Sequence, residues 1–178
     1  MNMKRIIVLL VVSMFAVGMA HAQLQVGPYF SIAAADDEYG YGGGIRGVQP
    51  LTENLLLDFR VSYLSYLHND AVPVELGLLG TASTGSCQWY AGGGCGYYIY
   101  MLDSETLDDT AEPGFFVTGG ASLTVTDGVR LFAEVKYTSA SVHLESDRRA
   151  LPGGGTSWTE ADRGLDGIGG NIGILWEL

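Results

Sequence analysis

The sequence is short of positive charge and of cysteine, and each shortage excludes a class of function. Nine Lys and Arg residues stand against 20 Asp and Glu residues, giving a formal net charge of −11 at pH 7. Proteins that bind nucleic acid need a basic surface, so we expect no nucleic-acid partner. The two cysteines, Cys87 and Cys95, do not have the spacing of a metal-binding pair, and we predict no metal site and no cofactor.

The two cysteines are also poorly placed for a disulfide. If both lie on one extended strand, the eight-residue separation holds them roughly 26 Å apart, which is far beyond the reach of an S–S bond. We therefore expect Cys87 and Cys95 to be unpaired small residues, unless a bend folds this segment back on itself.

Long apolar runs are absent beyond the N-terminal region. Lys4 and Arg5 precede an apolar run from Ile6 to about Met19, and Ala20-His21-Ala22 follows. This pattern predicts a secretory signal peptide over residues 1–22, because the run is shorter than the roughly 20 residues of a retained membrane-spanning helix. Residues 23–178 then form a single exported domain.

Proline is scarce and glycine is abundant, with 5 and 26 residues respectively. Disorder is one interpretation of so much glycine, but the mean hydropathy of +0.19 is too high for a disordered chain. Glycine inside strand patterns instead indicates a strongly curved sheet. No segment has a sustained helical period, so the chain is predicted to be all-β.

Eight segments alternate between apolar and polar residues, which predicts eight strands. They cover residues 24–34, 39–48, 55–67, 72–81, 88–101, 114–126, 129–142 and 165–178. The links after the second, fourth and sixth segments are tight, whereas most of the others are longer and acidic. Outer-membrane barrels sort their connections in this way. The pattern predicts an eight-stranded antiparallel up-and-down transmembrane β-barrel.

The two faces of the predicted strands differ sharply in charge. One face is nearly free of charge, and the other carries residues of both signs: Arg46, Asp58, Arg60, Glu75, Glu134, Lys136 and Glu177. In a soluble periplasmic barrel these charges would face water. In a membrane barrel they would face a lumen that eight strands leave just wide enough for side chains, and they would pair there. The mixture of signs favours the membrane arrangement, so we predict an interior filled by a charged network.

Aromatic residues on the apolar face gather near the predicted strand ends, as an interfacial girdle requires. These residues are Tyr39, Tyr41, Tyr63, Trp89, Tyr97, Tyr137 and Trp176. The final strand places Ile172, Ile174, Trp176 and Leu178 on the same face. We expect this strand to close the barrel against the first one, because closure removes sheet edges.

Several stretches together resemble the small outer-membrane β-barrel family that includes OmpA-, OmpX- and OmpW-type proteins. The matching pieces are residues 48–55, 89–98, 123–137 and the terminal strand. The resemblance implies a barrel in the outer membrane of a Gram-negative cell envelope, with both chain ends in the periplasm. It also implies contact with outer-membrane lipid and lipopolysaccharide, a monomeric state, and recognition of the terminal strand by the barrel-assembly machinery.

Four functions remain open at this point. The leading hypothesis is a non-enzymatic barrel with a structural or surface-interaction role, and a porin-like channel for small solutes or hydrophobic compounds is the first alternative. A lipid A-modifying enzyme is the second, for which His143, Glu145 and Ser146 are the nearest candidate group, although the start of a polar loop explains these residues better. A soluble periplasmic ligand-binding barrel is the third. We predict no catalytic residues.

Overall fold

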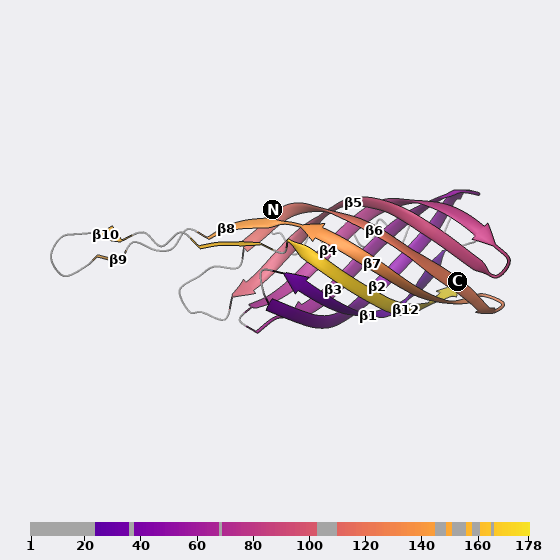
Figure 1. Ribbon diagram of the computed structural model, residues 1–178, viewed down its shortest axis with the longest axis horizontal. Coiled ribbons are helices and arrows are strands. Elements are labelled where there is room, and N and C mark those ends of the chain that lie inside the picture. The colour runs from indigo at the N-terminus through magenta and orange to yellow at the C-terminus, as the bar shows by residue number, and fades with distance from the viewer. Residues whose placement is uncertain are drawn as a thin grey trace.

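Eight long strands form a closed antiparallel barrel in the computed structural model (Figure 1). The structure describes residues 24–35, 38–67, 69–102, 110–144, 149–150, 156–157, 161–164 and 166–178. The barrel strands are β1 (Gln25–Ala35), β2 (Glu38–Thr52), β3 (Leu55–Ser65), β4 (Asn69–Thr84), β5 (Cys87–Leu102), β6 (Thr110–Thr126), β7 (Val129–Ser139) and β12 (Gly167–Glu177). The predicted signal peptide, residues 1–22, lies outside the described residues.

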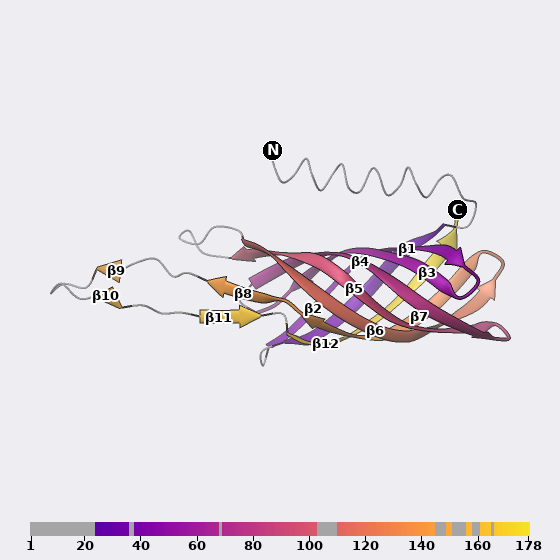
Figure 2. The ribbon, with the colours of Figure 1, turned by 90° about the horizontal axis from the view of Figure 1, so that it is seen from above.

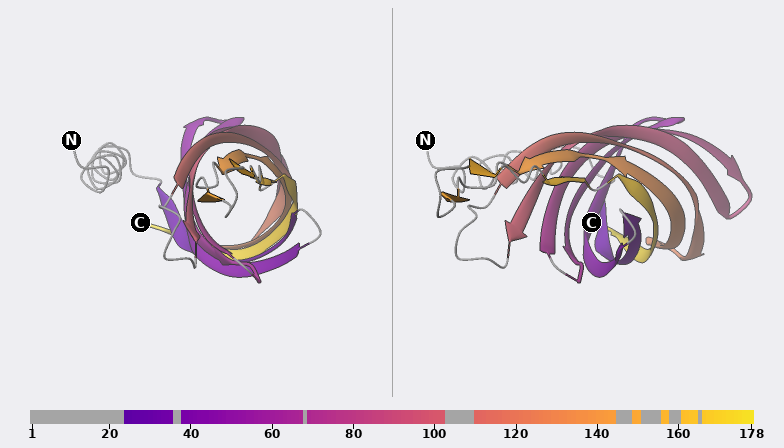
Figure 3. Two further views of the ribbon diagram at one scale, coloured as in Figure 1. Left: turned by 90° about the vertical axis from the view of Figure 1, so that its left-hand side faces the viewer. Right: turned by 60° about the vertical axis from the view of Figure 1, so that its left-hand side comes forward.

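Each barrel strand pairs with its neighbours in the chain, and β12 returns to pair with β1. The view down the long axis of the barrel shows the closed ring of strands (Figure 3, left). The predicted fold class, an eight-stranded up-and-down barrel, is confirmed. No helix in the part of the chain that the structure describes is long and apolar enough to span a membrane.

One end of the barrel, called here the short-turn end, carries three two-residue turns. They are Glu53-Asn54, Gly85-Ser86 and Asp127-Gly128. Gly85 and Gly128 have φ angles of 63° and 74°, a region that glycine enters without steric cost. The C-terminus lies at this end, where the Leu178 amide donates a hydrogen bond of 2.9 Å to the Leu24 carbonyl.

The opposite end, called the long-loop end, carries a two-stranded extension between β7 and β12 (Figure 2). Strand β8 (Ser141–Leu144) pairs with β11 (Ala161–Gly164), and β9 (Arg149–Ala150) pairs with β10 (Thr156–Ser157). The predicted seventh strand ran unbroken to residue 142, but β7 ends at Ser139. The Ala140 amide donates to the Asp166 carboxylate at 3.0 Å instead of pairing with a neighbouring strand.

Apolar side chains point away from the barrel axis over the whole wall, as the alternation predicted. Val135 is 60% exposed and Ile172 is 62% exposed, whereas Leu79 on an inward position is fully buried. An inward cluster of buried apolar and aromatic side chains lines the lumen and consists of Tyr29, Val48, Leu56, Leu79, Tyr90, Phe132 and Leu175. Cys87 and Cys95 both lie on β5, and both are free thiols.

Candidate functional site

Four charged side chains from three strands meet on the barrel axis. Arg46 projects inward from β2, Asp58 and Arg60 from β3, and Glu134 from β7. The Arg46 Nε donates to Asp58 Oδ1 at 2.9 Å, and its Nη1 lies 3.2 Å from Glu134 Oε2. Arg60 bridges the same two carboxylates, with its Nε 2.9 Å from Asp58 Oδ2 and its Nη2 3.1 Å from Glu134 Oε2. Two guanidinium groups and two carboxylates thus form one closed group.

A second ion pair lies beside this group. The Lys136 ammonium on β7 donates to both carboxylate oxygens of Glu75 on β4, at 2.8 and 2.9 Å. The Tyr98 hydroxyl donates to Glu75 Oε1 at 2.8 Å. The Phe116 ring connects the two groups, because Arg60 and Lys136 approach its centre to 5.5 and 5.7 Å. Cation–π contacts of this kind add to the ion pairs in a desolvated lumen.

The network is electrically neutral and almost completely removed from water. Its three cations and three anions, Arg46, Arg60, Lys136, Asp58, Glu75 and Glu134, are all buried. Burying a charge is costly unless it is paired and hydrogen-bonded. Here uncharged donors complete the pairing, since Asn171 Nδ2 donates to Glu134 Oε1 at 2.7 Å and the Tyr90 hydroxyl donates to Glu134 Oε2 at 2.9 Å.

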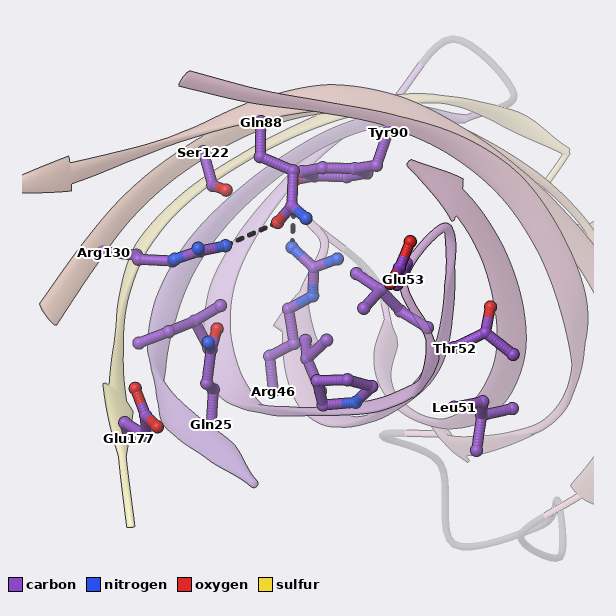
Figure 4. A pocket seen from close by; sticks show the side chains of 14 residues that line it. Gln25, Arg46, Leu51, Thr52, Glu53, Gln88, Tyr90, Ser122, Arg130 and Glu177 are labelled. Carbon is purple, nitrogen blue, oxygen red and sulfur yellow. Dashed lines mark hydrogen bonds between the residues drawn. The ribbon is translucent and has the colours of Figure 1, made fainter. Parts of the chain in front are cut away.

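The network separates a larger cavity on its short-turn side from a much smaller void on its long-loop side. A cavity of about 450 Å³ lies on its short-turn side and includes Arg46 in its lining (Figure 4). On the long-loop side, a void of only about 20 Å³ borders Lys136 and Tyr66. The Tyr66 ring covers Gly40 so closely that an added Cβ would lie 2.5 Å from it, and burial raises the pKa of Tyr66 to about 12. The network therefore stands between the larger cavity and the long-loop end.

Six of the seven residues predicted for the interior charge network belong to it. Glu177 does not, because it is exposed at the short-turn end, one residue before the C-terminus. Its backbone follows the inward alternation, but at the last position of β12 its carboxylate reaches water and borders the larger cavity. Glu177 was predicted to lie inside the lumen with the other charges, and this prediction was wrong. Alternation shows which face of the sheet a residue occupies, but not how far it lies from the end of the barrel.

Three uncharged members of the network were not predicted: Tyr90, Tyr98 and Asn171. Each occupies an inward position, and a signal for them was present in the sequence. Tyr90 and Tyr98 alternate on β5 with the outward Trp89 and Tyr97, so their hydroxyl groups had to find polar partners inside the lumen.

All seven residues of the predicted aromatic girdle are exposed on the outer wall: Tyr39, Tyr41, Tyr63, Trp89, Tyr97, Tyr137 and Trp176. Trp89 and Trp176 lie near the short-turn end, in the third residue of β5 and the penultimate residue of β12. Near the long-loop end, the Tyr63 hydroxyl donates to Asp70 Oδ2 at 2.5 Å. The tyrosines thus mark one end of the outer wall and the tryptophans the other.

The final strand forms the seam of the barrel. Ile172, Trp176 and Leu178 are exposed on the outer wall and Ile174 is partly exposed there, while Asn171 and Leu175 are buried inside. The strand pairs with β1 on one side, with Trp176 opposite Val26, and with β7 on the other, with Ile172 opposite Ala133.

The residues considered for enzymatic chemistry lie elsewhere. The backbone of His143 belongs to β8, but its side chain, together with Glu145 and Ser146, lies outside the described residues. Within the described part of the chain, no three His, Cys, Asp or Glu side chains gather in a way that could hold a metal ion.

The fold is that of small eight-stranded barrels of the outer-membrane type. Three solved structures share the fold: Neisserial surface protein A (14% identity, TM-score 0.61, covering 87% of this chain and 96% of that one), the N-terminal barrel domain of Pseudomonas aeruginosa OprF (11%, 0.61, 88% and 97%), and the outer membrane protein OprG from Pseudomonas aeruginosa (14%, 0.63, 87% and 95%). No family model and no curated protein sequence matches the chain. The resemblance inferred from the sequence to small outer-membrane barrels is thus confirmed at the level of the fold.

Proposed function

We propose that this protein is a non-enzymatic, monomeric barrel of the outer membrane, with a structural or surface-interaction role and no conducting pore. The outward apolar wall supports the membrane location, because an apolar surface of this extent on a water-soluble protein would be a liability for aggregation. The likeness to solved outer-membrane barrels supports the same location.

The observation that carries the non-conducting role is the neutral network across the lumen. A permeating solute would have to separate Arg46 and Arg60 from Asp58 and Glu134, four side chains that are buried and mutually bonded. Breaking such a pair leaves a buried charge without a partner, at a cost of about 3–5 kcal/mol. The outer wall would contact membrane lipid and lipopolysaccharide, and the outward residues of β12 would be the segment that the barrel-assembly machinery reads.

Conductance in planar bilayers tests the proposal. Protein refolded in neutral detergent should insert without producing stable conductance steps, whereas a porin of roughly 16 strands inserted by the same procedure should produce them. Migration on a gel with and without boiling shows in parallel that the sample is a folded barrel. Reproducible unitary steps whose frequency rises with the amount of folded protein would contradict the closed lumen and favour the channel alternative.

A further inference from the structure

The cavity of about 450 Å³ on the short-turn side of the network is lined by both polar and apolar side chains. Gln88, Tyr90, Ser122 and Arg130 line it together with the buried guanidinium of Arg46 (Figure 4). Val48, Leu56 and Leu175 contribute apolar surface. Ligand sites in proteins likewise combine apolar surface with convergent polar groups that fix the orientation of the ligand, although in this cavity the polar groups contribute the larger share of the lining.

The polar wall offers more hydrogen-bond donors than the surrounding residues use. Arg130 Nη1 donates to Gln88 Oε1 at 2.5 Å, and no carboxylate among the described residues forms an ion pair with Arg130. A guanidinium carries five N–H donors in a planar fork that suits a carboxylate or phosphate group. Arg46 adds a second guanidinium to the same cavity, and within the described part of the chain its Nη2 forms one hydrogen bond, a long contact of 3.4 Å to Asp58 Oδ2.

We propose that this cavity binds a small organic oxyanion, a molecule with one carboxylate or phosphate group and a compact apolar part. The oxyanion accepts hydrogen bonds from Arg130, next to Gln88, and the apolar part lies against Leu56 and Leu175. The site goes beyond the structural role proposed above, since it would exist whether or not the barrel also binds a partner at its surface.

The position of the cavity determines where its ligand comes from. The barrel wall separates the lumen from the bilayer, so the ligand reaches the site from the aqueous phase at the short-turn end and not laterally from lipid. The network blocks the way onward, which makes this a binding site and not a stage in permeation. Glu53 and Glu177 also line the cavity, and their carboxylates disfavour polyanions, so a single oxyanion is expected.

Ligand-observed fluorine NMR tests the proposal on the full-length barrel refolded in neutral maltoside micelles. The probes are para-fluorobenzoate and para-fluorophenyl phosphate, with the neutral isostere para-fluorobenzamide as a reference, and each is titrated against protein and against empty micelles. We expect at least one anionic probe to bind the folded protein, and to bind at least about tenfold more tightly than the neutral amide, because a charge-assisted hydrogen bond contributes that much affinity.

Three variants locate the site. Arg130→Gln should weaken binding of the anionic probe by at least about tenfold, and Arg130→Lys, which keeps the charge, should retain part of the affinity. Arg163→Gln makes the same change of charge in β11 at the opposite end of the barrel and should leave the affinity unchanged. Heat-modifiable migration confirms that every variant is folded.

Each other outcome overturns the proposal in a distinct way. No binding of either anionic probe to the folded wild-type protein would remove the site. If the wild type and Arg130→Gln bind the anionic probe with equal affinity, the probe binds elsewhere. If Arg130→Gln and Arg163→Gln lose the same affinity, the loss reflects the net charge of the protein and not the cavity. Equal affinity for the amide and the anions would show a cavity without the proposed selectivity.

Discussion

Arg60 is one of the two arginines that pair with both central carboxylates, Asp58 and Glu134. Its guanidinium contacts Asp58 and Glu134 at once, and its own side chain is 1% exposed. Arg60→Met keeps the length and apolar stem of the side chain but leaves two buried carboxylates short of a partner. We expect the free energy of unfolding to fall by about 3–5 kcal/mol, measured by urea titration of tryptophan fluorescence in lipid vesicles.

The matched control makes the same chemical change outside the network. Arg130→Met removes an arginine whose described side-chain partner is the neutral Gln88, at a partly exposed position near the short-turn end. Its cost should stay within about 1 kcal/mol, the range of a solvent-accessible polar contact. If both substitutions lower the stability equally, the network contributes no more than an ordinary surface arginine.

Substitutions of single residues on the outer wall test whether this wall is in contact with lipid. Val135 lies at the middle of β7 and is 60% exposed, whereas Val125, 58% exposed, lies beside the turn at the end of β6. In a bilayer, Val135→Lys should cost about 2–4 kcal/mol and Val125→Lys at most about 1 kcal/mol, because the cost of a charge depends on its depth. Unfolding titrations in vesicles measure both values, and equal costs for the two variants would argue against a membrane-spanning wall.

At the scale of the elements, the seam between β1 and β12 has no room for a side chain at Gly27. A Cβ added at Gly27 would lie 1.8 Å from the Ile174 carbonyl oxygen, and backbone atoms cannot yield as the end of a flexible side chain can. Gly27→Ala should therefore separate the closing strands locally and cost about 1–3 kcal/mol or more. The fraction of heat-modifiable protein after refolding should fall accordingly.

Gly80→Ala is the control for the seam, because an added Cβ there meets only the Ala91 carbonyl oxygen at an ordinary 3.7 Å. Its refolding yield should match that of the wild type. A Gly27→Ala protein that refolds as well as Gly80→Ala would mean that the seam tolerates the extra atom through a shift in the backbone.

The sequence predicted the elements well because a strand repeats every two residues. Alternation assigned the inward Asp58 and the outward Val135 correctly, since one shifted residue would have reversed every side chain. It did not predict the end of β7 at Ser139, which depends on a hydrogen bond from Ala140 to Asp166, 26 residues away. The sequence pattern continues through this point, so only the tertiary contact shows where the barrel strand stops.

The sequence could not predict which charged side chains pair inside the lumen, because these pairs also depend on tertiary contacts. Arg60 and Glu134 are 74 residues apart, and their contact depends on the stagger of strands around the whole closed barrel. The list of inward charges could therefore be predicted, but not which cation meets which anion, nor the division of the remaining space. The cavity at the short-turn end is what is left between side chains, and no single residue signals it.

At the scale of the whole molecule, the two ends of the barrel are chemically different. The short-turn end has three two-residue turns and the C-terminus, and the long-loop end has the β8–β11 extension, which pairs with itself and not with the barrel sheet. Interaction with partners outside the cell therefore falls to the long-loop end under the proposed function. The short-turn end would face the periplasm and supply the cavity with its ligand.

This orientation predicts which end antibodies reach on intact cells. An epitope inserted between Pro152 and Gly153, within the β7–β12 connection, should be detected on intact cells, whereas the same epitope inserted between Gly85 and Ser86 should be detected only after permeabilisation. Neither insertion interrupts a barrel strand, so both proteins should keep their heat-modifiable migration. Detection of the Gly85–Ser86 epitope on intact cells would reverse the orientation, and with it the direction from which the cavity is filled.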